Sequence, residues 1–240
     1  MISLTNKRLA LIIPVLGLSE PVTQVLSSFP SEKLLSLGFE TTAYIIYTPL
    51  EDTKGPLPSF LANFPVEVLI EPKKGYGQAY LTAFAKIKAD IFACLDGDMT
   101  YPLFLLPKLI SLSLSDNYLF LSTNRLIESN RDSFSGWNLV GNKLLSFFHH
   151  LLFHLPFRDT QSGFWLISSS FLDRLSLHET SFLFSSEIKL EAFLVDPSSC
   201  TEINIPYFQR NVSSKSVNKL ISGLNIGLFI LKRFLKKKQK

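Results

Sequence analysis

Two aspartates one residue apart, Asp96 and Asp98, are the residues best suited to chemistry in this sequence. They follow the apolar run DIFACL, residues 90–95, which is typical of a buried strand. Two carboxylates at a strand end can face one hard cation, and Mg²⁺ and Mn²⁺ commonly bridge such ligands to substrate phosphates. The same triplet also closes strands as an ordinary polar turn, so by itself it does not establish a metal site.

Further polar residues stand where other predicted strands end: Glu20, Lys74 with Gly75, and Arg125. The sequence predicts strands at residues 8–15, 41–47, 66–70, 90–95 and 118–122, with helices at 21–29, 78–89 and 102–113. Such alternation implies a mostly parallel α/β sheet, which binds ligands at the C-terminal ends of its strands. The glycine fingerprint of dinucleotide binding is absent after the first strand, which argues against a nicotinamide or flavin enzyme.

The chain also carries a series of short motifs in a characteristic order. They are IIPVLGLSEP, KKGYGQAY, CLDGDMTYP, STNR, GNKLL, RDTQSGFW, FLFSSEIKL and IPYFQRNVSSK. On these motifs the chain resembles family 2 glycosyltransferases, in particular the polyprenyl-phosphate branch that includes dolichyl-phosphate mannose synthase. The resemblance implies a GT-A fold with a Rossmann-like nucleotide half and an acceptor half at one cleft. It also implies inverting transfer of a hexose from GDP-mannose or UDP-glucose to a polyprenyl or dolichyl phosphate.

The resemblance assigns roles to individual residues. Asp96 and Asp98 would hold Mg²⁺ or Mn²⁺ together with the donor diphosphate. The remaining donor-binding residues would be Pro14, Glu20, Lys74 and Gly75, and the catalytic set would be Asp98, Arg125, Arg210 and Lys215. The three cations of that set would contact phosphates of donor or acceptor. A divalent ion and cationic side chains stabilise the charge that develops on a diphosphate leaving group, so the chemistry fits these residue types.

Other parts of the site leave alternatives open. The loop of residues 159–163 would lie on the acceptor side or be a plain Asp-Thr turn. Glu187 would either orient an acceptor or a loop, or be a solvated helix charge. The second strand ends Ile46-Tyr47-Thr48-Pro49, where relatives carry an acidic residue that contacts the nucleotide. Glu51 and Asp52 could replace that residue. Two further hypotheses are a transferase with a saccharide or lipid acceptor and a catalytically silent binding module.

Composition and charge bound the remaining possibilities. The 240 residues suffice for one sizeable domain, predicted at residues 1–218. From residue 203 onward the chain has nine Lys or Arg and no Asp or Glu, which leaves 15 basic and 20 acidic residues before it. We therefore expect residues 219–240 to form an amphipathic helix on a membrane surface rather than to bind nucleic acid; a solubilising tail is the alternative.

The expected location is the cytoplasm, peripheral on the cytosolic membrane face. The longest apolar stretch, residues 220–231, is shorter than the 20 or so residues that cross a bilayer. The N-terminus lacks the layout of a secretory signal. Two cysteines, Cys94 and Cys200, do not form a disulfide framework.

Overall fold

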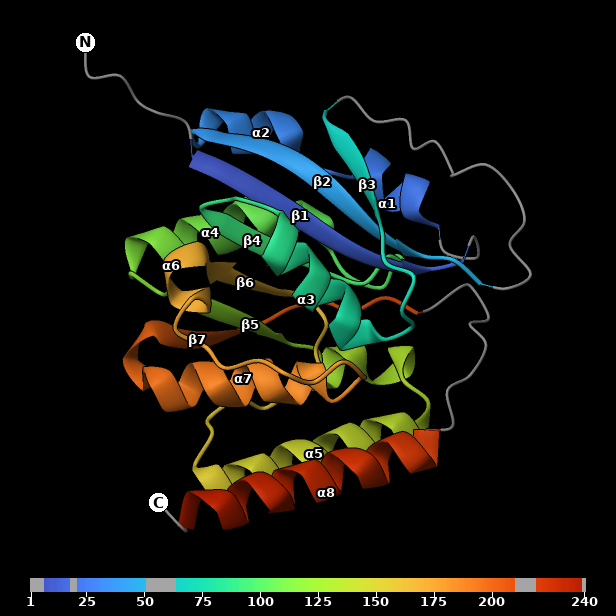
Figure 1. Cartoon of the computed structure of the whole chain (residues 1–240), viewed down its shortest axis with the longest axis vertical. Helices are drawn as coiled ribbons and strands as arrows, with labels where there is room; N and C mark the ends of the chain where they lie inside the picture. The colour runs from blue at the N-terminus through green and yellow to red at the C-terminus, as the bar shows by residue number, and fades with distance from the viewer. Residues whose placement is uncertain (1–6, 18–20, 51–63, 210–218, 239–240) are drawn as a thin grey trace.

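A seven-stranded mixed sheet organises the chain (Figure 1). The computed structural model describes residues 7–17, 21–50, 64–209 and 219–238. The strand order across the sheet is β3-β2-β1-β4-β6-β5-β7. The strands are β1 (Lys7–Leu16), β2 (Phe39–Thr48), β3 (Val66–Ile70), β4 (Ile91–Cys94), β5 (Phe120–Asn124), β6 (Trp165–Ser168) and β7 (Cys200–Asn204).

β6 is the strand that runs against its neighbours. It pairs antiparallel with β4 on one side and with β5 on the other, whereas β1 pairs parallel with β2 and β4, and β5 pairs parallel with β7. The beginning of β6 therefore lies at the same edge of the sheet as the ends of β4 and β5. This edge collects the loop after β4, the loop after β5 and the loop before β6.

Helices cover both faces of the sheet. One face is covered by α1 (Val22–Ser27), α2 (Ser31–Ser36) and α4 (Leu106–Ser115), whose buried leucines and valines join the odd-numbered residues of β1 in one core cluster. The other face is covered by α3 (Tyr76–Lys86) and α7 (Phe184–Val195), around the buried ring of Trp165. Successive residues of β1 point alternately into these two clusters, so both faces of the strand are buried. This explains its continuous apolar sequence.

A further layer, the pair α5 (Gly136–Phe153) and α8 (Lys219–Lys238), lies side by side below α7 in Figure 1. Ile226, Phe229 and Ile230 of α8 are buried, and the ring of Phe234 lies 5.9 Å from that of Phe153. Arg233 forms an ion pair with Glu191 of α7. A helix is present where the amphipathic membrane-surface helix was predicted, and part of its apolar surface is buried against the domain. Its place on a membrane surface stays a prediction. The remaining short elements are α6 (Ser169–Leu172) and three 3₁₀ turns, η1 (Leu103–Leu105), η2 (Glu128–Ser133) and η3 (Pro197–Ser199).

The mostly parallel α/β sheet predicted from the sequence is confirmed, with corrections to individual elements. The helix predicted at residues 78–89 spans Tyr76–Lys86, so it begins two residues earlier and ends three residues earlier. Residues 31–36 form a short helix that the sequence did not predict. Cys94 is buried and Cys200 is partly buried, and both are free thiols. In the described part of the chain, every helix is too short or too polar to span a membrane.

Candidate active site

The loop after β4 positions Asp96 and Asp98. Leu95 N donates to Ile12 O at 3.1 Å, which anchors the loop to β1 directly before the first aspartate. Asp98 is buried, and its Oδ1 accepts from Thr100 N at 3.2 Å and from Thr100 Oγ1 at 2.5 Å. Met99 between them adopts a left-handed conformation with φ of 65°, which is strained for a residue with a side chain. The hydroxyl of Thr100 and this turn fix one oxygen of Asp98.

Asp96 is held from two sides. Tyr76, the first residue of α3, donates its hydroxyl to Asp96 Oδ1 at 2.9 Å. On the other side lies Gly163, where an added Cβ would come within 2.6 Å of Asp96 Oδ2 and 2.7 Å of Oδ1. Gly163 N in turn donates to the hydroxyl of Tyr101 at 2.6 Å. The loop before β6 and the loop after β4 are therefore in direct contact at the carboxylate of Asp96.

Arg125, directly after β5, forms a buried two-pronged ion pair with Asp159. Its Nε donates to Asp159 Oδ2 at 2.7 Å and its Nη2 to Oδ1 at 3.0 Å, and Arg125 N donates to the same carboxylate at 3.1 Å. Burial alone would lower the pKa of Arg125 and raise that of Asp159. Their mutual attraction outweighs burial, so the pKa of Arg125 is raised and that of Asp159 is lowered. Both groups are charged in the folded protein.

Three aromatic rings surround this guanidinium. Its Cζ lies 5.1 Å from the ring centre of Tyr207, 5.7 Å from that of Phe134 and 5.9 Å from that of Tyr101. Rings at this range attract a cation, and they also exclude water from it. Arg125 is therefore fixed in position as well as in charge, at the edge of the sheet where Asp96 lies.

Lys189, on α7, contacts the loop before β6. The sequence did not identify it as a site residue. The side chain is fully buried, and its Nζ donates to Ser162 O at 2.7 Å and to Ser185 O at 3.2 Å. Burial lowers the pKa of Lys189 to about 7, against an opposing effect of the Asp159 carboxylate. A lysine in the middle of a helix is normally exposed to solvent. The sequence signal for a buried Lys189 would have been a helix α7 that is buried on all sides.

Glu187 is a buried structural residue rather than a solvated charge. Its carboxylate accepts from His178 N at 3.0 and 3.1 Å and from Glu179 N at 2.8 Å. The segment it holds packs on the start of α3, where Gln78 N donates to Thr180 O at 2.9 Å. A Cβ at Gly75 or Gly77 would collide with the carbonyl oxygens of this segment. Glu187 thereby helps to fix α3, the helix whose first residue, Tyr76, donates to Asp96.

The other predicted site residues are placed as follows. Pro14 is part of β1 and half-buried beside Ile46 of β2, and Lys74 is exposed in the turn before α3. Glu20, Arg210 and Lys215 lie outside the described residues, as do Glu51 and Asp52. The structure thus brings Asp96, Asp98 and Arg125 to one edge of the sheet. Gly75 directly precedes Tyr76, the first residue of α3, whose hydroxyl contacts Asp96. The catalytic and binding roles of these residues stay predictions.

The donor atoms at this edge fit a hard divalent cation that shares its ligands with a substrate. Within residues 7–17, 21–50, 64–209 and 219–238 no three His, Cys, Asp or Glu side chains form a metal cluster. Asp96 and Asp98 would therefore supply two carboxylates, with phosphate and water oxygens completing the shell. Such an incomplete protein shell is usual for Mg²⁺ and Mn²⁺ that act on phosphorylated substrates.

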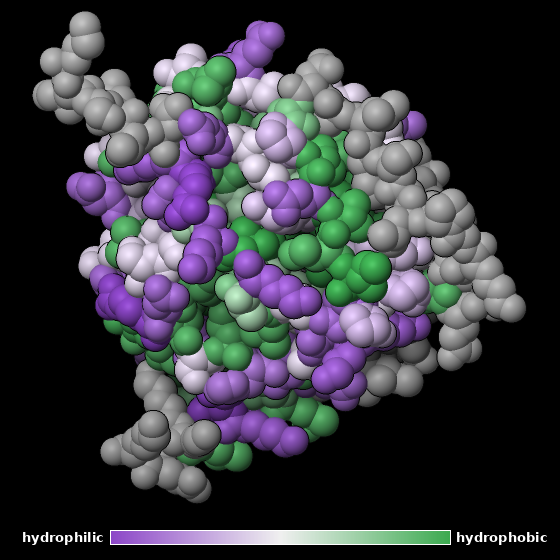
Figure 2. All heavy atoms as spheres, turned by 45° about the horizontal axis from the view of Figure 1, so that its top comes forward, coloured by the Kyte–Doolittle hydropathy of each residue, from purple (hydrophilic) through white to green (hydrophobic). Residues whose placement is uncertain are grey.

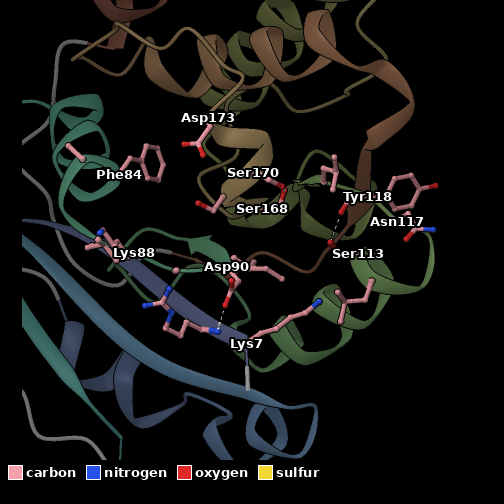
Figure 3. A pocket seen from close by; sticks show the side chains of 18 residues that line it. Lys7, Phe84, Lys88, Asp90, Ser113, Asn117, Tyr118, Ser168, Ser170 and Asp173 are labelled. Carbon is pink, nitrogen blue, oxygen red and sulfur yellow. Dashed lines mark hydrogen bonds between the residues drawn. The ribbon is translucent and has the colours of Figure 1, made fainter. Parts of the chain in front are cut away.

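A hollow of about 900 Å³ lies elsewhere, at the edge of the sheet where β1 and β4 begin (Figure 3). Lys7, Lys88, Asp90, Ser168 and Asp173 are among the residues that line it. Asp90 accepts from Arg8 N at 2.7 Å. Because the carboxylates of Asp96 and Asp98 are at the other edge, this hollow is not the candidate active site.

Comparison with known proteins agrees with the geometry. The model of glycosyl transferase family 2 matches residues 51–176, more than half of the chain and including the Asp96, Arg125 and Asp159 segments. The chain belongs to glycosyl transferase family 2. It is also 32% identical over 131 residues to the low-salt glycan biosynthesis hexosyltransferase Agl6 of Haloferax volcanii. That alignment covers 52% of this chain and 31% of the relative's length.

Solved structures with the same fold include a glucosyl-3-phosphoglycerate synthase and a mannosyl-3-phosphoglycerate synthase. Glucosyl-3-phosphoglycerate synthase from Mycobacterium tuberculosis, solved with Mn²⁺, UDP-glucose and phosphoglyceric acid, has a TM-score of 0.71 at 15% identity. The match covers 95% of this chain and 80% of that one. Mannosyl-3-phosphoglycerate synthase from Rubrobacter xylanophilus has a TM-score of 0.73 at 13% identity, covering 97% and 75% of the two chains. At these identities the likeness shows a shared GT-A-like fold.

Proposed function

We propose that this family 2 glycosyltransferase moves a hexose from a nucleotide sugar to the phosphate of a polyprenyl phosphate. The observation that carries the proposal is the contact between the Asp96–Asp98 loop and the loop before β6, which also holds Asp159 against Arg125. The two carboxylates suited to a metal–diphosphate complex thus adjoin the buried Arg125–Asp159 pair and the rings around it, which we call the wall. This wall lies on the side where an acceptor would bind. The proposed donor is GDP-mannose or UDP-glucose.

On the donor side, the chain would hold the nucleotide diphosphate through Asp96, Asp98 and a shared Mg²⁺ or Mn²⁺. When bound, the metal ion neutralises charge on the leaving diphosphate. Tyr76 and Gly163 restrict Asp96, and Thr100 restricts Asp98, so the carboxylates need little rearrangement when the donor arrives. Pro14, Lys74 and Gly75, with Glu20, would line the rest of the donor site.

On the acceptor side, the proposed nucleophile is a phosphate oxygen. A phosphate monoester has a second pKa of about 6, so it is mostly a dianion at neutral pH and needs no general base. The bond between the anomeric carbon and the diphosphate oxygen breaks with its electron pair leaving on the diphosphate. A bond from the acceptor phosphate oxygen forms on the opposite face, which inverts the anomeric centre. Arg210 and Lys215 would attract the acceptor phosphate.

Arg125 would act differently from a freely exposed cation. Asp159 already accepts from its Nε and from one N–H of its Nη2, so a phosphate would contact the N–H groups of Nη1 or the second N–H of Nη2. In this proposal Arg125 shapes the wall between donor and acceptor and contributes positive charge across it. The proposed location of the reaction is the cytosolic face of a membrane, where the lipid-linked acceptor would be reached.

A phosphorylated small molecule is the second candidate acceptor. Structural neighbours with TM-scores of 0.69 to 0.71 were solved with phosphoglyceric acid, so the GT-A-like fold of this chain is one that accommodates a soluble phosphorylated acceptor. The acceptors share a phosphate group and differ in the lipid. An assay that offers both to the same protein separates them.

The test is transfer of labelled hexose by the purified full chain. GDP-mannose and UDP-glucose are supplied separately, with polyprenyl phosphate or 3-phosphoglycerate as acceptor, and with Mg²⁺, Mn²⁺ or EDTA. We expect a lipid-soluble product from one donor that requires the metal ion. A water-soluble product instead would establish the second acceptor and overturn the first.

Matched variants tie the activity to the site. Asp98→Asn should abolish metal-dependent transfer, whereas Asp116→Asn, which changes an exposed aspartate after α4, should leave it unchanged. Full activity in Asp98→Asn would contradict the proposed metal role. Absence of product from both donors and both acceptors, together with no donor binding at millimolar concentration, would favour a silent binding module.

A further inference from the structure

The exposed sides of α5 and α8 are rich in large apolar residues. Six residues of α5 share one helical face and are exposed, at spacings of three, four, seven and eleven residues: Trp137, Val140, Leu144, Phe147, Phe148 and Leu151. Leu228, Leu231 and Leu235 form the corresponding exposed face of α8. We call these nine residues the α5–α8 face. Trp137 is 89% exposed, and the other eight are between 39% and 59% exposed.

This concentration of apolar residues is unusual for a surface that stays in water. Soluble monomers rarely expose a continuous apolar patch of more than a few hundred Å², and larger ones mark interaction sites. Figure 2 looks from the front and top of Figure 1, and it shows hydrophobic residues gathered near its centre with hydrophilic residues around them. The α5–α8 layer lies at the bottom of Figure 1, with its outer side turned away from that view.

Charge identifies the kind of partner. The two helices together contain seven Lys or Arg residues and no Asp or Glu. Lys143 and Lys232 are exposed beside the α5–α8 face, and the lysines of the sequence KKK end α8. If two copies of this chain met through this face, these like charges would be brought together. An anionic lipid surface offers opposite charge to the lysines and an apolar interior to the aromatic and leucine side chains.

We propose that α5 and α8 together dock the protein on an anionic membrane, with Trp137 and the other eight residues inserted at the headgroup boundary. The proposed surface therefore includes a helix from the middle of the sequence in addition to the C-terminal segment. It does not rest on the identity of donor or acceptor, because it is carried by exposure and charge alone.

The face is joined to the candidate active site through the start of α5. Phe134, three residues before Trp137, lies 5.7 Å from the Arg125 guanidinium and stacks on Tyr207 with ring centres 4.9 Å apart. Ser133 donates its hydroxyl to Tyr207 O at 2.7 Å. A membrane bound to the α5–α8 face would thus lie beside the wall that Arg125 and its three rings form.

Tryptophan fluorescence provides a direct test, since the chain has two tryptophans and Trp165 is fully buried. Vesicles of phosphatidylcholine with phosphatidylglycerol are added to the full chain, without donor or acceptor. We expect the emission of Trp137 to shift to shorter wavelength, and brominated lipids to quench it. Trp137→Phe should remove the change, while pure phosphatidylcholine vesicles should bind at least tenfold more weakly.

Co-sedimentation with the same vesicles separates the two helices. The triple variant Trp137→Gln, Phe147→Gln, Leu151→Gln should need at least tenfold more lipid for half-maximal binding, and so should Leu228→Gln, Leu231→Gln, Leu235→Gln. The control changes three exposed leucines elsewhere, Leu35→Gln, Leu114→Gln and Leu194→Gln, and should bind as the parent does. Circular dichroism during heating verifies that each variant is folded.

Two outcomes would overturn the proposal. One is vesicle binding of both triple variants equal to that of the parent. The other is a dimer in light scattering that both triple variants convert to monomer, combined with no binding of the parent to anionic vesicles, which would assign the face to a second copy. Because no sugar transfer is measured, failure of the proposed reaction would leave these results unaffected.

Discussion

The backbone of Gly163 lies against the carboxylate of Asp96, so that a methyl group added there would come within 2.6 Å of Oδ2. A real side-chain carbon would essentially never approach an oxygen this closely, and one of the two loops would have to shift. The carboxylate that is predicted to hold the metal ion is therefore positioned by a residue 67 places later in the sequence. Glycine is required at 163 because of space.

Gly163→Ala should reduce transfer activity about 10- to 100-fold, because displacement of a catalytic group by a fraction of an ångström or more is costly to reaction rates. The measurement is the initial rate of labelled hexose transfer at saturating and limiting Mn²⁺. Gly141→Ala is the matched control, since a Cβ at Gly141 meets nothing within 4 Å and alanine favours the helix. Equal rates for parent and Gly163→Ala would show that Asp96 does not need its present position.

The Arg125–Asp159 pair should be strongly coupled in stability. Asp159→Asn leaves a buried guanidinium without its counter-charge, and we expect it to lower the free energy of unfolding by about 3–5 kcal/mol. The double variant Arg125→Met, Asp159→Leu should lose much less than the sum of the single changes. Urea denaturation of Asp159→Asn, of the double variant and of its two single changes measures these losses.

The exposed pair Arg131–Glu128 is the control for that cycle. Its charges are 3.4 Å apart and largely in solvent, so Glu128→Gln should change stability by at most about 0.5 kcal/mol. Additive losses at Arg125 and Asp159 would mean that the two charges act independently in spite of their hydrogen bonds.

Lys189 should make stability depend on pH just above neutrality. Its pKa is about 7 in the folded protein, below the ordinary value of 10.5, so between these values the unfolded chain binds a proton that the folded chain lacks. The free energy of unfolding therefore rises with pH through this window, by roughly 1.5 kcal/mol between pH 7.0 and 8.5. Below pH 7 lysine is protonated in both states and this dependence ends.

Lys189→Met should remove that rise, which urea denaturation at pH 7.0 and 8.5 would detect as a difference between variant and parent. Other groups titrate in both proteins and cancel in the comparison. Lys86→Met, at an exposed position on α3, should retain the full rise. The same rise in Lys189→Met would show that the lysine keeps its proton in the folded state.

Glu187→Gln should loosen the segment that packs on the start of α3. An amide cannot accept three N–H contacts as the carboxylate does, so we expect faster hydrogen exchange at His178 and Glu179 and a loss of about 1–3 kcal/mol. Hydrogen exchange followed by mass spectrometry measures the first. Glu67→Gln, at an exposed position of β3, is the control. Unchanged exchange at residues 178–179 would assign the stability of this segment to other contacts.

The buried strands are the elements whose limits the sequence predicts best. β3 was predicted with its observed limits, and β1, β2 and β4 within two residues at each end, because continuous apolar runs have few other ways to be buried. Prediction was poorer for α1 and α2: the helix expected over residues 21–29 is six residues long, and a second short helix follows a proline. Boundaries of this kind depend on tertiary packing rather than on local pattern.

The candidate site was predictable where chemistry and position coincide in one short motif. Asp96 and Asp98 stand together in sequence, whereas Tyr76, Gly163 and Lys189 reach them only through the fold. A tyrosine at a helix start or a glycine before a strand has many ordinary explanations. Lys189 is the hardest case, because its burial follows from the two-sided packing of α7 between the sheet and the α5–α8 layer.

The reversed strand β6 leaves the first half of the sheet with an open edge during synthesis. β3, β2, β1 and β4 come from residues 7–94, but the partner that covers β4 is not made until residues 165–168. At about 5–20 residues per second, an apolar strand edge would wait several seconds on the ribosome, a state prone to aggregation. Substitutions that delay the pairing of Trp165–Ser168 would be expected to lower the yield of soluble protein before they change the folded molecule.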